Sequence, residues 1–388
     1  MKKLRVGVIY GGRSGEHEVS VTSAASIFKY IDRVRYEPVP IRIEKDGRWT
    51  IADRPPAALS AAEVIEQARM TTARTARHGR ETIMAAYPSD DTLVTMERRD
   101  PAELISDEGE QVTVNGLGLD VVFPVLHGPY GEDGTLQGLL ELANVPYVGA
   151  GVLASATGMD KAVMKTLFAA RGLPVVAWRG FVRSQWDRGR DGVLADLKPL
   201  GLPVFVKPAN LGSSVGISKV RSAAALPVAI EDALDFDRKV VVEAAVPMAR
   251  EIECAVLGND EPAASVPGEV VPSREFYDYE AKYLDAGSRT LIPADLTAAQ
   301  VAEVKRLAIE AFRAIDGAGL SRVDFLMNRD SGALWVNEIN TMPGFTSISM
   351  YAKMWEASGI GYTALVDRLI QLALARHAEK QRLRTSIL

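Results

Sequence analysis

The 388-residue chain has one cysteine, Cys254, no long apolar run and no excess of positive charge. A single cysteine excludes an internal disulfide and a cysteine-based zinc site, and it fits a reducing, cytoplasmic environment. No stretch of the sequence approaches the roughly 20 apolar residues that a membrane helix requires. The net charge of -5 disfavours nucleic-acid binding, because excess Lys and Arg normally meet a phosphate backbone. We therefore expect a cytoplasmic protein that binds neither nucleic acid nor a membrane.

Two common nucleotide-binding motifs are also absent from the sequence. No GxxxxGK[ST] P-loop occurs, and GVIYGGRSGE lacks the GxGxxG spacing of dinucleotide folds, which disfavours a dehydrogenase. The remaining phosphate-binding candidate is KPANLGSSVG, in which Lys207 ends a strand. Backbone N–H groups and hydroxyls in such a loop can surround phosphate oxygens. Taken alone, however, the segment is better explained as an ordinary hairpin turn.

Strand and helix patterns divide the chain into two parts. LRVGVIYGG, EPVPIRI and DVVFPVLHG predict strands that alternate with helices, which indicates an open, largely parallel α/β sheet. Residues 53–110 interrupt this pattern and are interpreted as an insertion. From about residue 150 the pattern is α+β with hairpins. There SATGMDKAVMKTLFAARG predicts a single helix, and Thr297 with Gln300 predicts the capped start of another.

One predicted hairpin brings polar side chains together near the C-terminal end. SRVDFLMN and ALWVNEIN are strands joined by a three-residue loop, 330–332, with glycine in the left-handed position. Directly opposed residues share a face, so this register also pairs Leu326 with Val336. A slip of one residue in this register would send the side chains of Asp324 and Glu338 to opposite faces. The polar residues placed on one face are Arg322, Asp324, Glu338 and Asn340.

This polar face has two interpretations. Facing carboxylates repel each other unless a cation or proton lies between them, and oxygen atoms of Asp, Glu and Asn suit Mg²⁺. Alternatively, the face is a solvated sheet surface on which Arg322 neutralises Asp324. The hairpin alone does not distinguish these interpretations.

Taken together, the motifs resemble those of D-alanine–D-alanine ligases of the ATP-grasp superfamily. VFVKP, GSSVG, KVVVE, REIE, FYDYEAKY, RVDF and NEINTMPGFTSIS occur in the order seen in that family. GGRSGEHEVS and HGPYGEDGT are similar to the family's substrate-domain motifs. The resemblance runs from about residue 4 to 370, except for 53–110. It favours the metal interpretation of the polar face.

The resemblance implies a domain plan and an activity. An N-terminal substrate-binding α/β domain, 1–149, would precede a central ATP-grasp domain, 150–247, and a C-terminal ATP-grasp catalytic domain, 248–388. A lid loop would cover about 273–293. The implied reaction is ATP-dependent ligation of two D-alanines through D-alanyl phosphate, supplying peptidoglycan precursors, in a homodimer. The alternatives are the same chemistry with D-lactate or D-serine as acceptor, and a nucleotide-binding sensor without catalysis.

The resemblance also implies roles for residues that match the family's motifs. ATP would be bound by Lys161, Lys207, Gly212, Ser214, Glu243, Glu251 and Lys282. Two Mg²⁺ ions, with Mn²⁺ as a substitute, would be held by Asp324, Glu338 and Asn340. The catalytic set would be Glu16, Ser213, Tyr283, Arg322 and Gly344. The substrates would contact Val19, His127, Lys282, Ser349 and Met350.

Individual roles follow from the same resemblance. Glu16 would anchor the ammonium of the first D-alanine, and Arg322 with the Gly344 N–H would bind the oxyanion of the tetrahedral intermediate. Glu243 would mark the adenine-binding linker and Glu251 would bind the ribose. The intact EAKY segment of the lid favours D-alanine as the acceptor. Ala244 and Ala245 depart from the bulkier residues often seen in the linker.

Overall fold

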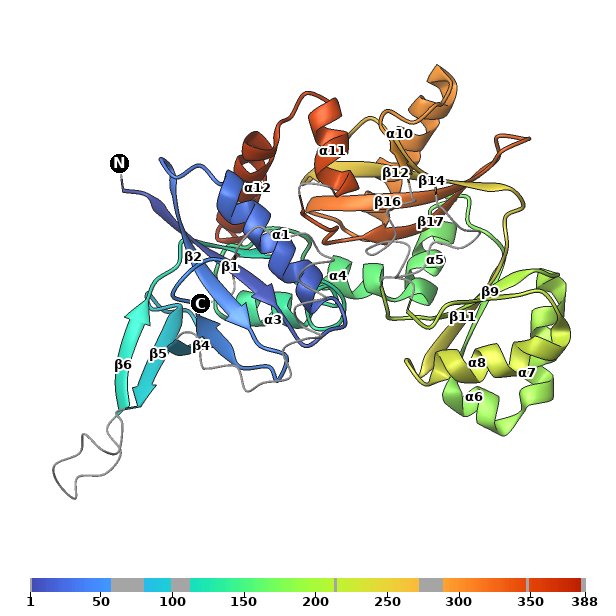
Figure 1. Ribbon diagram of the computed structural model, residues 1–388, viewed down its shortest axis with the longest axis horizontal. Helices are drawn as coiled ribbons and strands as arrows, with labels where there is room; N and C mark the ends of the chain where they lie inside the picture. The colour runs from blue at the N-terminus through green and yellow to red at the C-terminus, as the bar shows by residue number, and fades with distance from the viewer. Residues whose placement is uncertain are drawn as a thin grey trace. The chain divides into compact units, whose positions relative to one another are not determined.

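The computed structural model describes residues 2–56, 80–98, 112–212, 215–271, 289–346 and 349–384. The chain divides into two compact units, whose elements can be followed by colour in Figure 1. Unit 1 comprises Met1–Val152, Gly344–Ala352 and Ile360–Leu388. Unit 2 comprises Leu153–Pro343 and Lys353–Gly359. Among the described residues, no helix is long and apolar enough to cross a membrane.

Unit 1 is built on a sheet with the strand order β6-β5-β4-β3-β2-β1-β7. Its centre is parallel and consists of β1 (Leu4–Gly11), β2 (Tyr36–Ile43) and β7 (Val121–Pro124). Antiparallel strands extend it on one side: β3 (Trp49–Ile51), β4 (Arg80–Met84), β5 (Leu93–Arg98) and β6 (Val112–Leu117). The predicted α/β class is confirmed, and the segment interpreted as an insertion supplies β4 and β5 to this extension.

Helices cover both faces of the parallel centre, which explains why β1 is apolar along nearly its whole length. Helices α1 (His17–Tyr30) and α12 (Tyr362–Lys380) contact each other on one face, where Phe28 meets Tyr10 with ring centroids 6.4 Å apart. Helix α3 (Thr135–Leu142) packs Leu136 and Leu140 on the other face, against a core that includes Ile9. Figure 1 shows α1 and α3 at the two sides of β1 and β2.

The loops that follow β1 and β7 lie at the edge of the sheet formed by the carboxyl ends of these strands. The chain leaves the carboxyl end of β1 through α1 to β2, whereas β7 lies on the opposite side of β1. The loops that follow β1 and β7 therefore diverge at one edge. In open α/β sheets, ligands bind at the carboxyl ends of the strands where the strand order reverses in this way.

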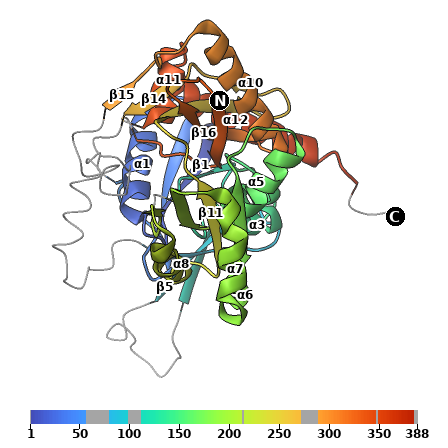
Figure 2. The same cartoon turned by 90° about the vertical axis from the view of Figure 1, so that its right-hand side faces the viewer.

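Unit 2 contains two antiparallel sheets (Figures 1 and 2). The first has the order β10-β9-β11-β8, formed by β8 (Trp178–Val182), β9 (Val204–Pro208), β10 (Ser218–Val220) and β11 (Lys239–Ala244). Its core is covered by α6 (Arg183–Arg188), α7 (Arg190–Leu197) and α8 (Leu226–Leu234). The predicted pairing of the two strands around the GSSVG loop is confirmed, because β9 and β10 are antiparallel neighbours.

The second sheet of unit 2 carries the predicted hairpin. Its order is β15-β14-β12-β16-β17, and β13 pairs with β12. The strands are β12 (Ala249–Gly258), β13 (Ala263–Ala264), β14 (Gly268–Val271), β15 (Arg289–Leu291), β16 (Gly319–Asn328) and β17 (Leu334–Asn340). Helix α10 (Ala298–Ala314) begins at the predicted capping box of Thr297 and Gln300 and packs across one face. Cys254 is fully buried in unit 2, and burial raises its thiol pKa to about 12, so the thiol stays protonated.

The single helix predicted around MDK is two helices, α4 (Val152–Met159) and α5 (Lys161–Ala170). They are separated at Asp160, whose extended backbone cannot continue a helix. The Asp160 carboxylate accepts hydrogen bonds from the N–H groups of Ala162 and Val163, both at 3.1 Å, and so caps α5. This break makes Lys161 the first residue of a helix. A further helix, α11, spans Met350–Ala357.

The hairpin of β16 and β17 has the predicted register at its functional end but not at its turn. Asp324 pairs with Glu338 and Arg322 with Asn340, which confirms the prediction. The loop, however, has four residues, 329–332, because the N–H of Asn328 donates to the carbonyl of Ala333. Gly332 is left-handed, with φ of 69°, as predicted. The predicted pairing of Leu326 with Val336 is wrong.

A β-bulge at Asn337 reconciles the longer loop with the predicted register. Val336 pairs with Phe325, so the register shifts by one residue between Phe325 and Asp324. The extra residue places Val336 and Ile339 on the same buried face although they are three apart. One face of the hairpin is therefore apolar and packs under α10, while the other is polar. Bulges commonly redirect side chains near functional sites.

Candidate functional site

On the polar face of the second sheet, Arg322 forms one network with two of the predicted metal ligands, Asp324 and Asn340. Arg322 donates from Nε and Nη2 to the two carboxylate oxygens of Asp324, both at 2.6 Å. Asn340 donates from Nδ2 to Asp324 at 3.1 Å. Arg322 also lies 3.2 Å from the carboxylate of Glu253, which pairs directly with Asp324 across β12 and β16. Bidentate guanidinium–carboxylate geometry of this kind is both strong and directional.

Neighbouring charges outweigh burial in setting the pKa of Arg322. Arg322 is 8% exposed, and burial by itself lowers its pKa. The negative charges of Asp324 and Glu253 outweigh burial, so the pKa of Arg322 lies well above its ordinary value. Arg322 is therefore always cationic. A permanent cation at this position favours negatively charged partners in a mostly buried site.

The side chains that face each other fit a hard cation. Asp324, Glu338 and Asn340 supply carboxylate and amide oxygens from adjacent strands, the donor type that Mg²⁺ prefers. Among the described residues, no group of three or more His, Cys, Asp or Glu side chains is placed to hold a metal. Two carboxylates and an amide would fill only part of the octahedral shell of Mg²⁺ and would leave positions for water and phosphate oxygens. Both oxygens of Asp324 accept from Arg322, and the remaining lone pairs of this carboxylate would be the ones that bind a cation.

A second charged cluster lies where the two sheets of unit 2 approach α5. Glu243 on β11 is an ion-pair partner of Lys207 on β9 at 2.8 Å and of Lys165 on α5 at 3.0 Å. Burial raises the pKa of Glu243, but the two lysines outweigh it and hold the pKa at about 2. Burial lowers the pKa of Lys165, whereas the negative charges of Glu243, Glu338 and Glu251 together outweigh burial and raise the pKa of Lys207. Glu243 is thus ionised at all physiological pH values.

We expect the buried Glu243 to make the stability of the protein depend on pH. Its pKa is about 2 in the folded chain and 4.5 ordinarily, so its ionised form stabilises the fold above pH 4.5. This contribution is lost as the pH falls from 4.5 towards 2. Glu243→Gln should lower the free energy of unfolding at neutral pH by about 3–5 kcal/mol, because it leaves Lys165 buried without its counter-charge.

Denaturant unfolding of the wild type and of Glu243→Gln between pH 7 and pH 2 measures this contribution. The difference between their free energies of unfolding should become smaller as the pH falls below 4.5. Glu303→Gln is the control, since Glu303 pairs with Arg306 on the exposed side of α10. Its effect should stay within about 0.5 kcal/mol. A pH-independent difference for Glu243→Gln would contradict the assignment of its charge.

The other predicted phosphate residues lie beside this cluster. Lys161, at the start of α5, donates from Nζ to the carbonyl of Leu211 at 2.5 Å, and its N–H donates to Ala209 at 3.0 Å. Gly212 follows directly and accepts a hydrogen bond from Val215 at 3.3 Å. The loop after β9 is thus held by the helix that supplies Lys161. Ser213, Ser214, Lys282, Tyr283 and the lid residues 273–288 lie outside the described residues.

The predicted substrate residues of unit 1 gather on the loops after β1 and β7. Ser14 donates from Oγ to the carbonyl of His127 at 2.7 Å and accepts from the N–H of Glu16 at 3.2 Å. A carboxylate oxygen of Glu16 lies 3.0 Å from where a Cβ on Gly128 would be. Gly128 is left-handed, with φ of 76°, so a side chain there would meet both strain and the carboxylate. Val19 is buried one turn further along α1.

Ser23 connects this loop cluster to the segment that follows β17. Its Oγ lies 3.1 Å from Nε2 of the buried His127 and accepts from the N–H of Phe345 at 3.2 Å. The ring of Phe345 is fully buried among aromatic rings, and its carbonyl accepts from the Tyr362 hydroxyl. The neighbouring Gly344 is thereby fixed in unit 1.

The short turn after Phe345 places the remaining substrate residues. Ser349 accepts from the N–H of Thr346 at 3.0 Å, and its N–H donates back to Thr346 at 3.1 Å. The Oγ of Ser349 is 3.2 Å from where a Cβ on Gly344 would be, so glycine is the residue that this close approach accommodates. Met350 begins α11 directly after this turn. The structure thus brings together Glu16, Val19, His127, Gly344, Ser349 and Met350 in unit 1.

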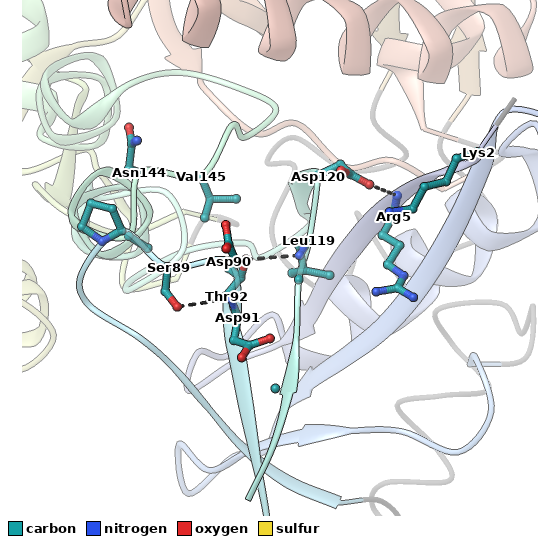
Figure 3. Close-up of a pocket in the computed structure, with 14 residues that line it drawn as sticks. Lys2, Arg5, Ser89, Asp90, Asp91, Thr92, Leu119, Asp120, Asn144 and Val145 are labelled. Carbon is teal, nitrogen blue, oxygen red and sulfur yellow. Dashed lines mark hydrogen bonds between the residues drawn. The ribbon is translucent and has the colours of Figure 1, made fainter.

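A separate pocket of about 860 Å³ lies at the opposite edge of the sheet in unit 1 (Figure 3). It is lined by Lys2 and Arg5 before and in β1, by residues 88–92 and by Asp120 before β7. Figure 3 shows the N–H of Arg5 directed at Asp120, a hydrogen bond of 2.6 Å. This edge carries the amino ends of β1 and β7, and ligands of parallel sheets bind at the carboxyl ends. None of the predicted site residues that the structure describes lines it.

Several residues of the site were not predicted from the sequence. They are Ser14, Ser23, Lys165, Glu253 and the bulge residue Asn337. A signal exists for two of them: Lys165 lies one helical turn after Lys161, between the buried Met164 and Phe168, and Glu253 lies two residues after Glu251 on the same strand face. The serines and the bulge leave no comparable pattern, because their contacts join distant segments.

Comparison with known proteins agrees with this arrangement. Family models described as D-ala D-ala ligase N-terminus and C-terminus match residues 5–150 and 167–371. The D-alanine–D-alanine ligase of Heliobacterium modesticaldum is 51% identical over 98% of both chains. That of Bacillus cytotoxicus is 43% identical over the full length of both.

Solved structures show the same relationship. The D-alanine–D-alanine ligase of Coxiella burnetii superposes with a TM-score of 0.79 at 36% identity, covering 98% of this chain and 97% of that one. The VanG D-Ala:D-Ser ligase of Enterococcus faecalis has the same TM-score at 32% identity, covering 96% and 100%. The chain belongs to the D-alanine–D-alanine ligase family.

Proposed function

We propose that the protein joins two D-alanines in an ATP-dependent reaction that forms D-alanyl-D-alanine, ADP and phosphate. The observation that carries the proposal is the register of β16 and β17, which places Asp324 opposite Glu338 beside Arg322 and Asn340. The side chains of Arg322 and Asp324 are 10% and 15% exposed, which disfavours a solvated surface, and oxygen ligands of this composition suit metal ions and triphosphate. The full-length similarity to named D-alanine–D-alanine ligases supports the same activity.

In the first step, the carboxylate of one D-alanine attacks the γ-phosphorus of ATP, giving D-alanyl phosphate and ADP. Lys161 and Lys207 bind phosphate oxygens, Glu251 binds the ribose, and Glu243 holds Lys207 in place. Two Mg²⁺ ions, bound by Asp324, Glu338 and Asn340, would neutralise charge on the transferring phosphoryl group. Glu16 binds the ammonium of the first D-alanine next to the loop of His127.

In the second step, the amine of another D-alanine attacks the carbonyl carbon of D-alanyl phosphate, and phosphate leaves. Arg322 and the N–H of Gly344 donate to the oxygen that becomes negative in the tetrahedral intermediate. Ser349 and Met350 bind the carboxylate of the second D-alanine. Lys282, Ser213 and Tyr283 are assigned to the lid and the substrate network by resemblance to the family. Exclusion of water by such a lid would protect the acyl phosphate from hydrolysis.

The remaining assignments concern the whole protein. The segments 1–149, 150–247 and 248–388 are proposed as the substrate, central and catalytic domains. We also propose a cytoplasmic homodimer that supplies peptidoglycan precursors. Elution volume combined with light scattering tests the dimer, for which a single species of about twice the chain mass is expected.

Phosphate release from ATP tests the reaction and its acceptor. With D-alanine alone, phosphate and the dipeptide should form in equal amounts, and L-alanine should support neither. Adding D-serine or D-lactate to limiting D-alanine should change the product little if D-alanine is the preferred acceptor. A mixed product dominated by D-serine would support the alternative acceptor, which the likeness to the D-Ala:D-Ser ligase keeps open. Absence of any D-alanine-dependent turnover would contradict the proposed function.

Ser23→Ala is expected to weaken D-alanine binding. The substitution removes the hydroxyl that joins His127, a proposed substrate residue, to the N–H of Phe345, which follows Gly344. We expect KM for D-alanine to rise roughly tenfold and stability to fall by about 1–2 kcal/mol, with KM for ATP within about twofold of wild type.

Thr22→Val is the matched control for Ser23→Ala. Thr22 is buried on the same helix, and its hydroxyl donates only to the carbonyl of Glu18 one turn earlier. Steady-state kinetics of both variants should therefore differ in KM for D-alanine. If the two variants had equal KM for D-alanine and only Ser23→Ala were less stable, the role of Ser23 would be purely structural.

A further inference from the structure

Lys165 is fully buried, yet it belongs to no motif of the site. Its Nζ lies 3.0 Å from Oε1 of Glu243 and donates to the carbonyl of Asn337 at 3.1 Å. The side chain of Lys165 is 0% exposed and that of Glu243 is 3% exposed. A buried ammonium is costly unless it is paired and hydrogen-bonded, so this placement has to be held by these contacts.

The charges around Glu243 explain what the buried lysine does. Glu243 also pairs with Lys207 at 2.8 Å, through its other oxygen, and Lys207 is the lysine proposed to bind ATP phosphates. Without Lys165, Glu243 would neutralise Lys207, which would then attract an anion weakly. Lys165, Lys207 and Glu243 together carry a net charge of +1, and Lys207 is the member of this cluster with some solvent exposure. Glu338 and Glu251, whose charges also act on Lys207, are the residues proposed to bind metal and the ribose.

We propose that Lys165 is a positioning residue that neutralises Glu243 from within, so that Glu243 can hold Lys207 in place while Lys207 keeps a positive charge available for the polyphosphate. This inference rests on the proposed function and assigns a role to a residue outside the ATP contacts. It also explains why a carboxylate lies so close to a phosphate-binding lysine. Glu243 orients Lys207. Lys165 offsets the negative charge of Glu243, which would otherwise weaken the attraction of Lys207 for the polyphosphate.

The hydrogen bond from Lys165 to Asn337 extends this role to the second sheet. Asn337 is the bulge residue that precedes Glu338, and α5 lies beside β17 (Figure 1). One ammonium group thus connects the phosphate-binding lysine with the strand that carries two of the three proposed metal ligands. Bulged backbone lacks a regular ladder partner, and a buried donor supplies one.

The experiment measures binding of MgADP and of magnesium tripolyphosphate, a probe without adenine, by calorimetry on the full chain. Lys165→Met should weaken both by at least about tenfold, since it cancels the net charge of the cluster. The double variant Lys165→Met/Glu243→Gln restores the charge of +1. It should bind tripolyphosphate within about threefold of wild type, whatever contact Glu243 makes with adenine.

Lys239→Met is the matched control. Lys239 pairs with Asp160 at the start of the same helix α5, so its loss removes a more exposed lysine–carboxylate pair that does not involve Glu243. It should leave tripolyphosphate binding within about twofold of wild type. Thermal unfolding of every variant establishes a temperature at which all are folded, and Lys165→Gln replaces Lys165→Met if the latter does not fold.

Four results separate failure of the inference from failure of the proposed function. Unchanged binding by Lys165→Met, or a double variant no better than the single one, overturns the inference and leaves the proposed function intact. Weakened binding by Lys239→Met to the same degree as by Lys165→Met would show a general effect of α5 and would also overturn it. A wild-type protein that binds neither probe overturns the proposed function, and the inference with it.

Discussion

Asp324→Asn should reduce dipeptide synthesis by on the order of 10³-fold, with little loss of fold. The amide has the shape of the carboxylate, so the side chain still fits between Arg322 and Asn340, but its NH2 group cannot accept, and one of the two hydrogen bonds from Arg322 is lost. It removes the negative charge that a divalent cation requires, and phosphoryl transfer depends on that cation to spread charge over the phosphate oxygens. Arg322 keeps Glu253 as a partner at 3.2 Å, which limits the cost in stability.

The measurement is the rate of dipeptide and phosphate formation across a titration of Mg²⁺. Asp330→Asn serves as the control because Asp330 lies in the exposed loop of the same hairpin. It should retain the wild-type rate and the wild-type Mg²⁺ dependence. If Asp324→Asn kept more than a tenth of the activity at low Mg²⁺, the carboxylate could not be a metal ligand and the polar face would be only a solvated sheet surface.

Arg322→Met is expected to damage both stability and activity. The guanidinium contacts Asp324 bidentately at 2.6 Å and lies 3.2 Å from Glu253, so its loss leaves two mostly buried carboxylates beside each other. Breaking a buried ion pair in this way costs about 3–5 kcal/mol. Dipeptide synthesis should fall on the order of 10³-fold, because the proposed oxyanion loses a charged donor.

Two further variants separate these effects. Arg322→Lys keeps the charge but not the planar fork, so most of the stability should return while activity stays about 10²-fold below wild type. Arg250→Met removes a similar bidentate pair with Glu269, at 2.9 and 2.6 Å, from the opposite face of the same sheet. It should lose stability and keep its turnover per folded molecule. Full activity of Arg322→Lys would exclude a directional role for the guanidinium.

Local sequence patterns predicted those features whose causes lie within a few residues. The strand at LRVGVIYGG, the helix after it and the capping box of Thr297 and Gln300 are present as predicted. The break at Asp160 was missed because α4 and α5 share a helical periodicity, and the cap is decided by one carboxylate reaching two N–H groups. Such a cap stabilises the start of a helix by only about 1 kcal/mol, so a capped break differs little in energy from a continuous helix.

The hairpin shows how a correct register can follow from a partly wrong derivation. A three-residue loop and an unbroken ladder predict the pairing of Asp324 with Glu338, and a four-residue loop with one bulged residue yields the same pairing. The apolar residues distinguish the two solutions. Val336 and Ile339 are three apart, and both can be buried under α10 only if one residue between them is left out of the ladder.

The sequence by itself determined the family of the protein, the alternation of strands and helices in unit 1 and the facing pair of Asp324 and Glu338, because each depends on short-range spacing. Only the tertiary structure decided that Lys165 is the counter-ion of Glu243, that Ser23 joins His127 to Phe345, and that a bulge lies at Asn337. These contacts join segments far apart in the chain. Burial and distance, which fix the energy of a charge or a hydroxyl, exist only once those segments have packed.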